Sequence, residues 1–267
     1  MLTARSAEIR RLRRLTRSSD ERRSRSVVVL EGARVLDAAL QRGATVRDVY
    51  ADVEERTRYT DVLERAATAG SHIHPVERGV LDRVRDVVTS PGIIGVADFT
   101  ITALRPALSG ATLVLVAVDV SDPGNAGTLI RSAEAFAASA VVFCGTSVDV
   151  RNPKVTRASA GACFGVPVVE EDDPMQTLEA VGHAGLRRLA AVSHGGAAPE
   201  DLPLREPVAW VVGSEAHGLA TDVVGRAEAT VSIPMASPSE SLNVGVAASV
   251  LLYTTVRSRR TVTDDPA

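Results

Sequence analysis

Short apolar runs alternate with amphipathic segments along most of the chain, and this alternation constrains the fold more than any other feature. The run LVLVAV at 113–118 is followed by a helical pattern over 126–138, and the same order recurs up to a long helix over 241–257. Strands that are apolar throughout and separated by helices are typical of a parallel sheet covered on both faces. The sequence therefore predicts an α/β fold with a mostly parallel sheet.

The alternation occurs in two runs. In the first run we expect strands at 27–32, 46–51, 72–76 and 92–99, and helices over 33–43, 58–70 and 80–87. In the second run we expect strands at 113–119, 140–144, 166–169, 187–193, 208–212 and 229–233, and helices over 126–138, 153–161, 174–184 and 241–257. Each run has enough apolar residues for a core of its own, which predicts two α/β domains.

Between the two runs, residues 100–111 lose the alternation and contain Pro106 and Gly110, so we expect a linker there. The predicted parts of the chain are a basic helical arm, a small α/β domain, a larger α/β domain and a disordered tail. Their expected bounds are 1–25, 26–105, 112–258 and 259–267.

Charge is distributed unevenly along the chain. Residues 1–25 hold nine arginines and three acidic residues, a net charge of +6, whereas the whole chain carries −3. A basic arm on an acidic body suggests an anionic partner that is approached through the N-terminus. The alternative is a helix whose charged face is simply solvated.

Composition excludes several classes of protein. The apolar runs are far shorter than the roughly 20 residues of a membrane-spanning helix, and no apolar core follows the N-terminal arginines as it would in a signal peptide. Cys144 and Cys163 do not suggest a disulfide framework, so we expect a cytoplasmic protein. His72 and His74 lie two apart on a predicted strand, but a half-exposed strand explains them, and no metal is expected.

Ligands of parallel sheets bind beyond the carboxyl ends of the strands, which directs attention to the loops at 119–126, 213–218 and 234–242. The first loop lacks both G-x-G-x-x-G and G-x-x-x-x-G-K-[ST], so neither phosphate-binding fingerprint is met. In the second loop, Gly213 directly follows a strand, where a ligand can approach the backbone closely. The third loop is polar and opens a helix of small residues.

Each of these loops also has a local explanation. Asn125 is a suitable helix cap, Glu215 complements a helix dipole, and Ser239 or Ser241 is a sensible N-cap for the last helix. Arg131 could pair with Glu134 or hold a phosphate.

Taken together and in order, the three loops resemble a known family. The segments DPGNAGTLIRSAEAF, VVGSEAHGL and IPMASPSESLNVGVAASVLLY look like the three motifs of the SpoU (TrmH) family of RNA 2′-O-ribose methyltransferases. The resemblance includes RNPKVTRASAGACFGVPV at 151–168 and covers about 112–257. Residues 26–99, with VVVLEGARVLDAAL, resemble the L30e-like substrate-binding domain of many members. The third motif departs from the family pattern at one point. Its loop reads MASPSES, whereas a glycine is common in this loop in the family.

The resemblance implies a trefoil-knotted α/β catalytic domain that binds S-adenosyl-L-methionine in the knot. By motif, the expected cofactor-binding residues are Gly213, Ile233, Leu242, Gly218 and Met235. The resemblance also implies a homodimer formed through the knotted domain, for which the small-residue face of 244–252 is a suitable surface.

The resemblance implies methyl transfer to a ribose hydroxyl. The residues expected around that hydroxyl are Arg131, Asn125, Glu215, Ser241 and Asn243. A role as general base has been proposed for the arginine of the family. We favour an electrostatic clamp, since a guanidinium is always protonated. We expect Glu215 to hold Arg131, and Asn125 and Asn243 to orient the ribose and the arginine.

The expected partner is RNA, with 23S ribosomal RNA as the substrate. The arginines expected to follow its backbone are Arg10, Arg11, Arg13, Arg14, Arg22 and Arg23. Alternatives are a methyltransferase acting on transfer RNA and an RNA-binding protein of the same fold without catalysis. A nicotinamide-dependent oxidoreductase is a further alternative, against which the missing glycine fingerprint argues.

Overall fold

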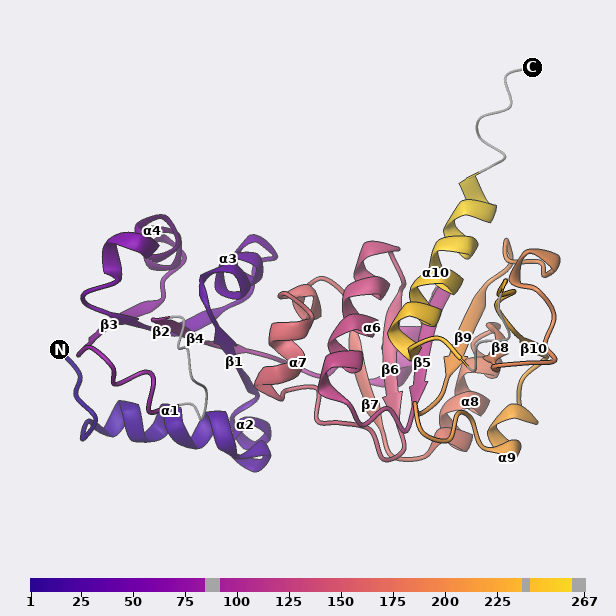
Figure 1. The fold of residues 1–267 in the computed structure, drawn as a ribbon, viewed down its shortest axis with the longest axis horizontal. Helices are drawn as coiled ribbons and strands as arrows, with labels where there is room; N and C mark the ends of the chain where they lie inside the picture. Colours follow the sequence, from indigo (N-terminus) through magenta and orange to yellow (C-terminus); the bar gives the residue numbers. More distant parts are fainter. Residues whose placement is uncertain (85–91, 237–240, 261–267) are drawn as a thin grey trace, which may run out of the picture. The chain divides into compact units, whose positions relative to one another are not determined.

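The computed structural model describes residues 1–84, 92–236 and 241–260 (Figure 1). The chain divides into two compact units, of which unit 1 comprises 1–100 and 149–165 and unit 2 comprises 101–148 and 166–267. This division differs from the expected bounds in two places. The basic N-terminal segment is part of unit 1, and so are residues 149–165, which we expected inside the second domain.

Unit 1 is built on a four-stranded mixed sheet. Its elements are α1 (Ala7–Arg17), α2 (Ser19–Arg25), β1 (Val27–Glu31), α3 (Ala33–Gln41), β2 (Val46–Asp52), η1 (Arg56–Tyr59), α4 (Thr60–Thr68), β3 (His72–Val76), β4 (Ile93–Asp98), α7 (Pro153–Ala158) and η2 (Ala162–Phe164). The strand order is β1-β4-β2-β3; β4 is antiparallel to both neighbours and β2 is parallel to β3. All four expected strands are confirmed. The helix expected over 80–87 is wrong for residues 80–84, where the chain makes turns. Residues 85–87 lie outside the described residues.

Helix α1 packs against the sheet of unit 1 rather than extending as an arm. Ile9, Leu12 and Leu15 recur at helical spacing, are at most 1% exposed, and join the core formed with β1 and β4. The apolar stripe was visible in the sequence, but the density of arginines around it suggested a detached segment. The expectation of a separate arm is therefore wrong for α1.

Residues 149–165 are held within unit 1 by contacts to its first elements. Arg22 Nη2 donates to Asp149 Oδ2 at 2.7 Å, and Arg157 Nη1 donates to Glu31 Oε2 at 2.7 Å. The hydroxyl of Thr156 donates to the carbonyl oxygen of Val29 in β1 at 3.0 Å. These contacts explain why α7 belongs to unit 1.

Unit 2 contains a six-stranded sheet that is entirely parallel. Its elements are α5 (Leu104–Leu108), β5 (Leu113–Val118), α6 (Pro123–Ala135), β6 (Ala140–Cys144), β7 (Val168–Glu171), α8 (Pro174–His183), β8 (Arg187–Ala191), η3 (Pro199–Asp201), β9 (Val208–Val212), α9 (Thr221–Val224), β10 (Ala229–Val231) and α10 (Val244–Arg260). The strand order is β10-β8-β9-β5-β6-β7. The predicted parallel sheet is thus confirmed.

Helices cover the sheet of unit 2 on two sides. On one face, alternate residues of β5 and β6 pack with Leu178 of α8 and with Ala107 and Leu108 of α5. Residues 100–111 are therefore not a plain linker, because part of the stretch is a short helix with buried apolar residues. On the other face, α6 and α10 lie side by side (Figure 1), and Trp210 of β9 donates its Nε1 hydrogen to Thr255 Oγ1 of α10 at 2.9 Å.

No helix in the described ranges is long and apolar enough to cross a membrane. Cys144 and Cys163 are free thiols and both are buried. Helix α10 extends to Arg260, so the first two residues of the expected tail are helical, and 261–267 lie outside the described residues.

Candidate functional site

The first motif loop ends in a helix start that leaves Asn125 available. Asp122 caps α6 by accepting the backbone N–H of Asn125 at 2.8 Å, and Pro123 occupies the first helical position. The capping role that local propensity suggested for Asn125 is therefore filled by Asp122. As a result, the amide side chain of Asn125 is directed to other partners.

These partners come from the other two motifs. Asn125 Nδ2 donates to Glu215 Oε1, and Asn243 Nδ2 donates to Asn125 Oδ1 at 2.9 Å. One hydrogen-bonded chain of side chains, Glu215–Asn125–Asn243, thus joins loops that are 90 and 118 residues apart in sequence. We call this chain the amide network.

Asn243 also starts the last helix. Its Oδ1 accepts the backbone N–H groups of Gly245 at 2.9 Å and Val246 at 3.3 Å, which makes Asn243 the N-cap of α10. The expectation that Ser241 provides the cap is wrong, and Ser239 lies outside the described residues. The cap and the amide network therefore share one side chain.

Helices α6 and α10 approach closely because of a glycine. A Cβ at Gly245 would lie 2.7 Å from Thr128 Cγ2, and one turn later the Ser132 and Ser249 hydroxyl oxygens are 2.7 Å apart. The small residues of α10 thus face α6 of the same chain. They do not form the free surface that we expected for a second subunit.

A cavity of about 520 Å³ lies beyond the carboxyl ends of β8, β9 and β10, where a parallel sheet binds its ligands. It is lined by all five residues expected to bind the cofactor, which are Gly213, Gly218, Ile233, Met235 and Leu242. Glu215, Ser241 and Asn243 line it as well. Eight of the ten predicted catalytic and cofactor residues therefore meet in one place.

The turn after β9 shapes one wall of this cavity. A Cβ at Gly213 would overlap the carbonyl of Gly218 and lie 2.7 Å from the backbone nitrogen of Leu219, so this position requires glycine. The turn is closed by the Gly218 N–H, which donates to the Ser214 carbonyl at 2.8 Å, and Gly218 has φ of +65°.

The cavity has mixed walls and little charge. Side chains of Val192, Val212 and Leu242 supply apolar surface, and no lysine or arginine is among its described lining residues. Such a lining suits a ligand with both polar and apolar parts better than one that carries phosphates.

Asn125 and Arg131 do not belong to the described cavity lining. Asn125 nevertheless contacts two lining residues through the amide network. Arg131 is exposed on α6, and in the described chain its side chain makes no hydrogen bond or ion pair. The expected Glu215–Arg131 pair is absent there, because Glu215 accepts the amide of Asn125 instead.

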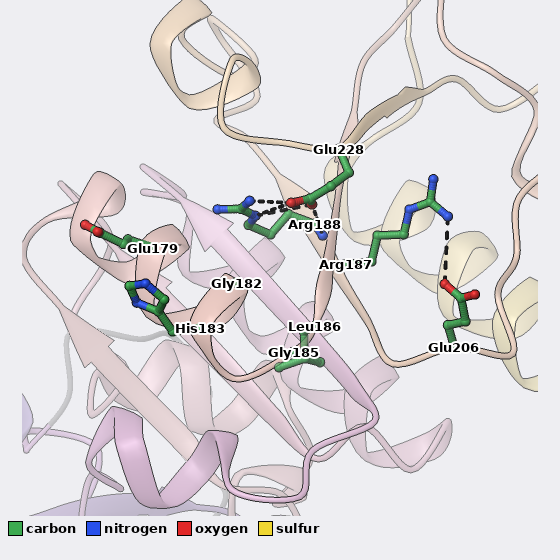
Figure 2. A pocket seen from close by; sticks show the side chains of 9 residues that line it. All are labelled: Glu179, Gly182, His183, Gly185, Leu186, Arg187, Arg188, Glu206 and Glu228. Carbon is green, nitrogen blue, oxygen red and sulfur yellow. Dashed lines mark hydrogen bonds and ion pairs between the residues drawn. The ribbon is translucent and has the colours of Figure 1, made fainter.

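A second hollow in unit 2 lies at the amino end of β8, on the opposite edge of the sheet from the motif loops. Figure 2 shows that four of its charged groups are already paired. Arg188 is bonded to Glu228, and Arg187 Nη1 lies 3.9 Å from Glu206 Oε2. Burial raises the pKa of Glu228, but its hydrogen bonds to Arg188 and the charge of that guanidinium bring the pKa below its usual value. The hollow has no feature of a catalytic site.

The arginines expected to bind RNA differ in their surroundings. Arg10, Arg14 and Arg23 are exposed and Arg11 and Arg13 are half-buried. Arg22 is 4% exposed and donates to the carbonyl oxygen of Leu15 and to Asp149. Arg22 therefore stabilises the fold, and its expected role in RNA binding is withdrawn.

The positive charge of residues 1–25 belongs to unit 1, whose remaining residues hold nearly equal numbers of basic and acidic side chains. Unit 1 holds 21 of the 30 Lys and Arg residues and 16 of the 33 Asp and Glu residues, a net charge of +5, against −8 for unit 2. The uneven charge was visible in the sequence, and the structure assigns the positive segment to unit 1 rather than to a separate arm. His74 of the histidine pair on β3 has its Nε2 2.8 Å from Asp48 Oδ1. The described residues contain no group of three His, Cys, Asp or Glu side chains that could hold a metal ion.

The parallel sheet, the cavity beyond its strands and the network at the rim of that cavity together define a ligand-binding α/β protein. Residues 112–253 match the model of the SpoU rRNA Methylase family. The chain is 36% identical over 228 residues to an uncharacterized tRNA/rRNA methyltransferase of Mycobacterium ulcerans, covering 82% of this chain and 72% of the relative. It is 28% identical over 242 residues to the 23S rRNA (guanosine-2′-O-)-methyltransferase RlmB of Bordetella pertussis, covering 88% and 99%.

Solved structures agree with these relatives. The SpoU methyltransferase AviRb of Streptomyces viridochromogenes, in complex with AdoMet, superposes with a TM-score of 0.84 at 26% identity, covering 96% of this chain and 99% of that one. An RNA 2′-O ribose methyltransferase superposes with a TM-score of 0.78 at 29% identity, covering 97% and 98%. The chain belongs to the SpoU rRNA methylase family.

Proposed function

We propose that this protein transfers the methyl group of S-adenosyl-L-methionine to a ribose 2′-hydroxyl of RNA, with 23S ribosomal RNA as the substrate. The observation that carries the proposal is the amide network, which links all three motifs at the rim of a cavity lined by the five predicted cofactor residues. The names of RlmB and of the RNA 2′-O ribose methyltransferase support the acceptor group.

The cavity fits this cofactor. Its volume lies within the range of small-molecule sites, the apolar part of its lining suits an adenine ring, and its polar groups suit the ribose and the methionine end. Backbone groups around Gly213, Ile233 and Leu242 would provide the hydrogen bonds, and the carboxylate of Glu215 would supply negative charge to a cationic sulfonium. When bound, the cofactor supplies an electrophilic methyl group.

Arg131 is proposed to act on the RNA rather than on the cofactor. Its exposed guanidinium, without a partner in the described chain, is available to a phosphate next to the reacting ribose. There it would hold the ribose and stabilise the negative charge that develops on the oxygen. Asn125 and Asn243 would orient the ribose, and Ser241 would contact the RNA at the same rim.

Unit 1 is proposed to bind RNA as an L30e-like domain. Its net charge of +5 and the exposed Arg10, Arg14 and Arg23 favour contacts with the phosphate backbone. Half-buried Arg11 and Arg13 would contribute at the same surface. A cytoplasmic location is consistent with this role and stays a prediction.

We also propose a homodimer that forms through unit 2. Its contact would use large exposed side chains of α10, because the small residues of this helix face α6. Val246 and Tyr253 are 48% and 50% exposed, which is unusual for large apolar side chains on one helix. We also propose a trefoil knot in unit 2. Its support is that the 193–197 loop pairs with the end of β10, where Ala197 forms a parallel bridge with Val231 and its carbonyl accepts the Ser232 N–H at 3.0 Å.

The test is transfer of labelled methyl to unmodified ribosomal RNA and to pooled transfer RNA, with Arg131→Ala protein alongside. Label in ribosomal RNA that the variant does not produce supports the proposal. Label only in transfer RNA overturns the substrate and keeps the chemistry. Cofactor binding without label in either RNA or in ribosomal particles favours a non-catalytic RNA-binding protein.

A further inference from the structure

The reaction releases a proton, and the roles assigned so far name no acceptor for it. Methylation of a hydroxyl frees one proton in each turnover, and Arg131 cannot take it because a guanidinium is already protonated at neutral pH. The acceptor of that proton can be inferred from the cavity lining, and this inference rests on the proposed function.

Two titratable side chains line the cavity in the described part of the chain, Glu215 and His217. The carboxylate of Glu215 already accepts the amide of Asn125. His217 is exposed, and its ring forms no hydrogen bond or ion pair with any described residue. Its ring nitrogens are therefore available to a ligand in the cavity.

The backbone around His217 is held firmly relative to the catalytic residues. His217 lies within the turn that the Gly218 N–H closes on the Ser214 carbonyl at 2.8 Å. The Ser214 hydroxyl accepts the Ala216 N–H at 3.3 Å, and Glu215 ties the same turn to Asn125. These hydrogen bonds hold the backbone of His217 at a fixed position relative to the amide network.

We propose that His217 is the proton acceptor for the RNA hydroxyl. The O–H bond breaks and an N–H bond forms on the imidazole, while the electron pair stays on the oxygen and forms the new bond to the methyl carbon as the carbon–sulfur bond breaks. The imidazolium then releases its proton to water, because the side chain is exposed. Imidazole is suited to this step, since it changes charge between about pH 5 and 8.

The surroundings of His217 are consistent with this role. The cavity is bounded by the ends of β8, β9 and β10, by the 213–219 turn and by the start of α10. Among the described residues that line the cavity, Glu215 is the one other titratable side chain. Its negative charge stabilises an imidazolium as it forms.

The test is the single-turnover rate of His217→Gln protein on the RNA that the wild-type protein methylates, measured from pH 5 to 9. We expect the rate at pH 7.5 to fall by about 10²-fold, the usual scale for loss of an acid–base group, with RNA and cofactor affinity unchanged. The wild-type rate should fall toward acid pH, because a protonated imidazole cannot accept the proton, and this limb should be absent in the variant. His183→Gln on α8 is the matched control and should retain the wild-type profile.

A readout independent of turnover is modification by diethyl pyrocarbonate, followed by mass spectrometry. S-adenosylhomocysteine and the acceptor RNA together should protect His217 and leave His183 reactive. A wild-type rate in His217→Gln protein, or equal reactivity of His217 in the free and bound protein, overturns the inference. No methyl transfer by the wild-type protein instead overturns the proposed function.

Discussion

Asn243 Nδ2 donates to Asn125 Oδ1 at 2.9 Å, while the other end of the same side chain caps α10. One residue thereby joins the start of the last helix to the first motif. This double role allows stability and activity to be separated by mutation.

Asn243→Asp should separate them. An aspartate still accepts the N–H groups of Gly245 and Val246 but cannot donate to Asn125. We therefore expect thermal stability close to wild type and methyl transfer reduced by about 10²-fold, the scale of a 1 Å misplacement of reacting groups. Asn243→Ala should lose about 1 kcal/mol of stability as well, because the cap is removed. Equal activity of the aspartate variant and the wild type would contradict the role of the network.

Gly245→Ala should destabilise the protein even though alanine favours helices. Its Cβ would lie 2.7 Å from Thr128 Cγ2, so we expect a loss of about 1–3 kcal/mol in urea unfolding. Thr128→Ser removes that methyl group and keeps the hydroxyl that donates to the Gly124 carbonyl at 2.9 Å. The cost of Gly245→Ala should therefore be smaller in the Thr128→Ser background, and a strictly additive double-mutant cycle would contradict the close packing.

Substitution of Arg22 should lower stability, whereas substitution of Arg10 should weaken RNA binding. Arg22→Ala leaves Asp149 without its buried partner and should cost about 3–5 kcal/mol of stability. Arg10→Ala is exposed and should leave thermal unfolding unchanged while it weakens RNA binding. In a plot of log RNA affinity against log salt concentration, the line for this variant should be less steep by about 0.7–0.9, the value for one lost phosphate contact. Retained stability in Arg22→Ala protein would contradict its structural role.

These residues show which features a sequence can predict. The strands were predictable because each is a short apolar run bounded by turn residues, and the three motif loops followed from the carboxyl ends of those strands. Arg22 resembled its exposed neighbours, because its burial depends on Asp149, 127 residues further on. Likewise Ser239, Ser241 and Asn243 have similar capping propensity, and only the tertiary contact with Asn125 selects Asn243.

Cys144 should be unreactive in the native protein. Burial raises the pKa of its thiol to about 12, so almost no thiolate forms at pH 8. Cys163 is buried too, and we expect no reaction of native protein with Ellman's reagent but two equivalents in urea. Since the folded state keeps the thiol of Cys144 protonated, its contribution to stability is present below pH 9 and is lost as the pH rises toward about 12. Rapid labelling of native Cys144 would contradict its burial.

The dimer proposal predicts that Val246→Arg converts the protein to a monomer in light scattering. An arginine cannot be buried in an apolar contact without a partner, whereas the exposed site tolerates it in one chain. Tyr253→Arg should act in the same way. Glu179→Arg, on the far helix α8, is the control and should leave the mass unchanged. A monomeric wild-type protein would contradict the proposal.

The proposed acceptor atom is a ribose 2′-oxygen, and the position of the transferred methyl group tests this proposal most directly. Methylated RNA should be digested to nucleosides and also cleaved with alkali, with Asn125→Ala and Arg131→Ala proteins in parallel. We expect one 2′-O-methylnucleoside, resistance to alkali at a single phosphodiester bond, and loss of both with either variant. A methyl group on a base, with every phosphodiester bond still cleaved, would contradict it.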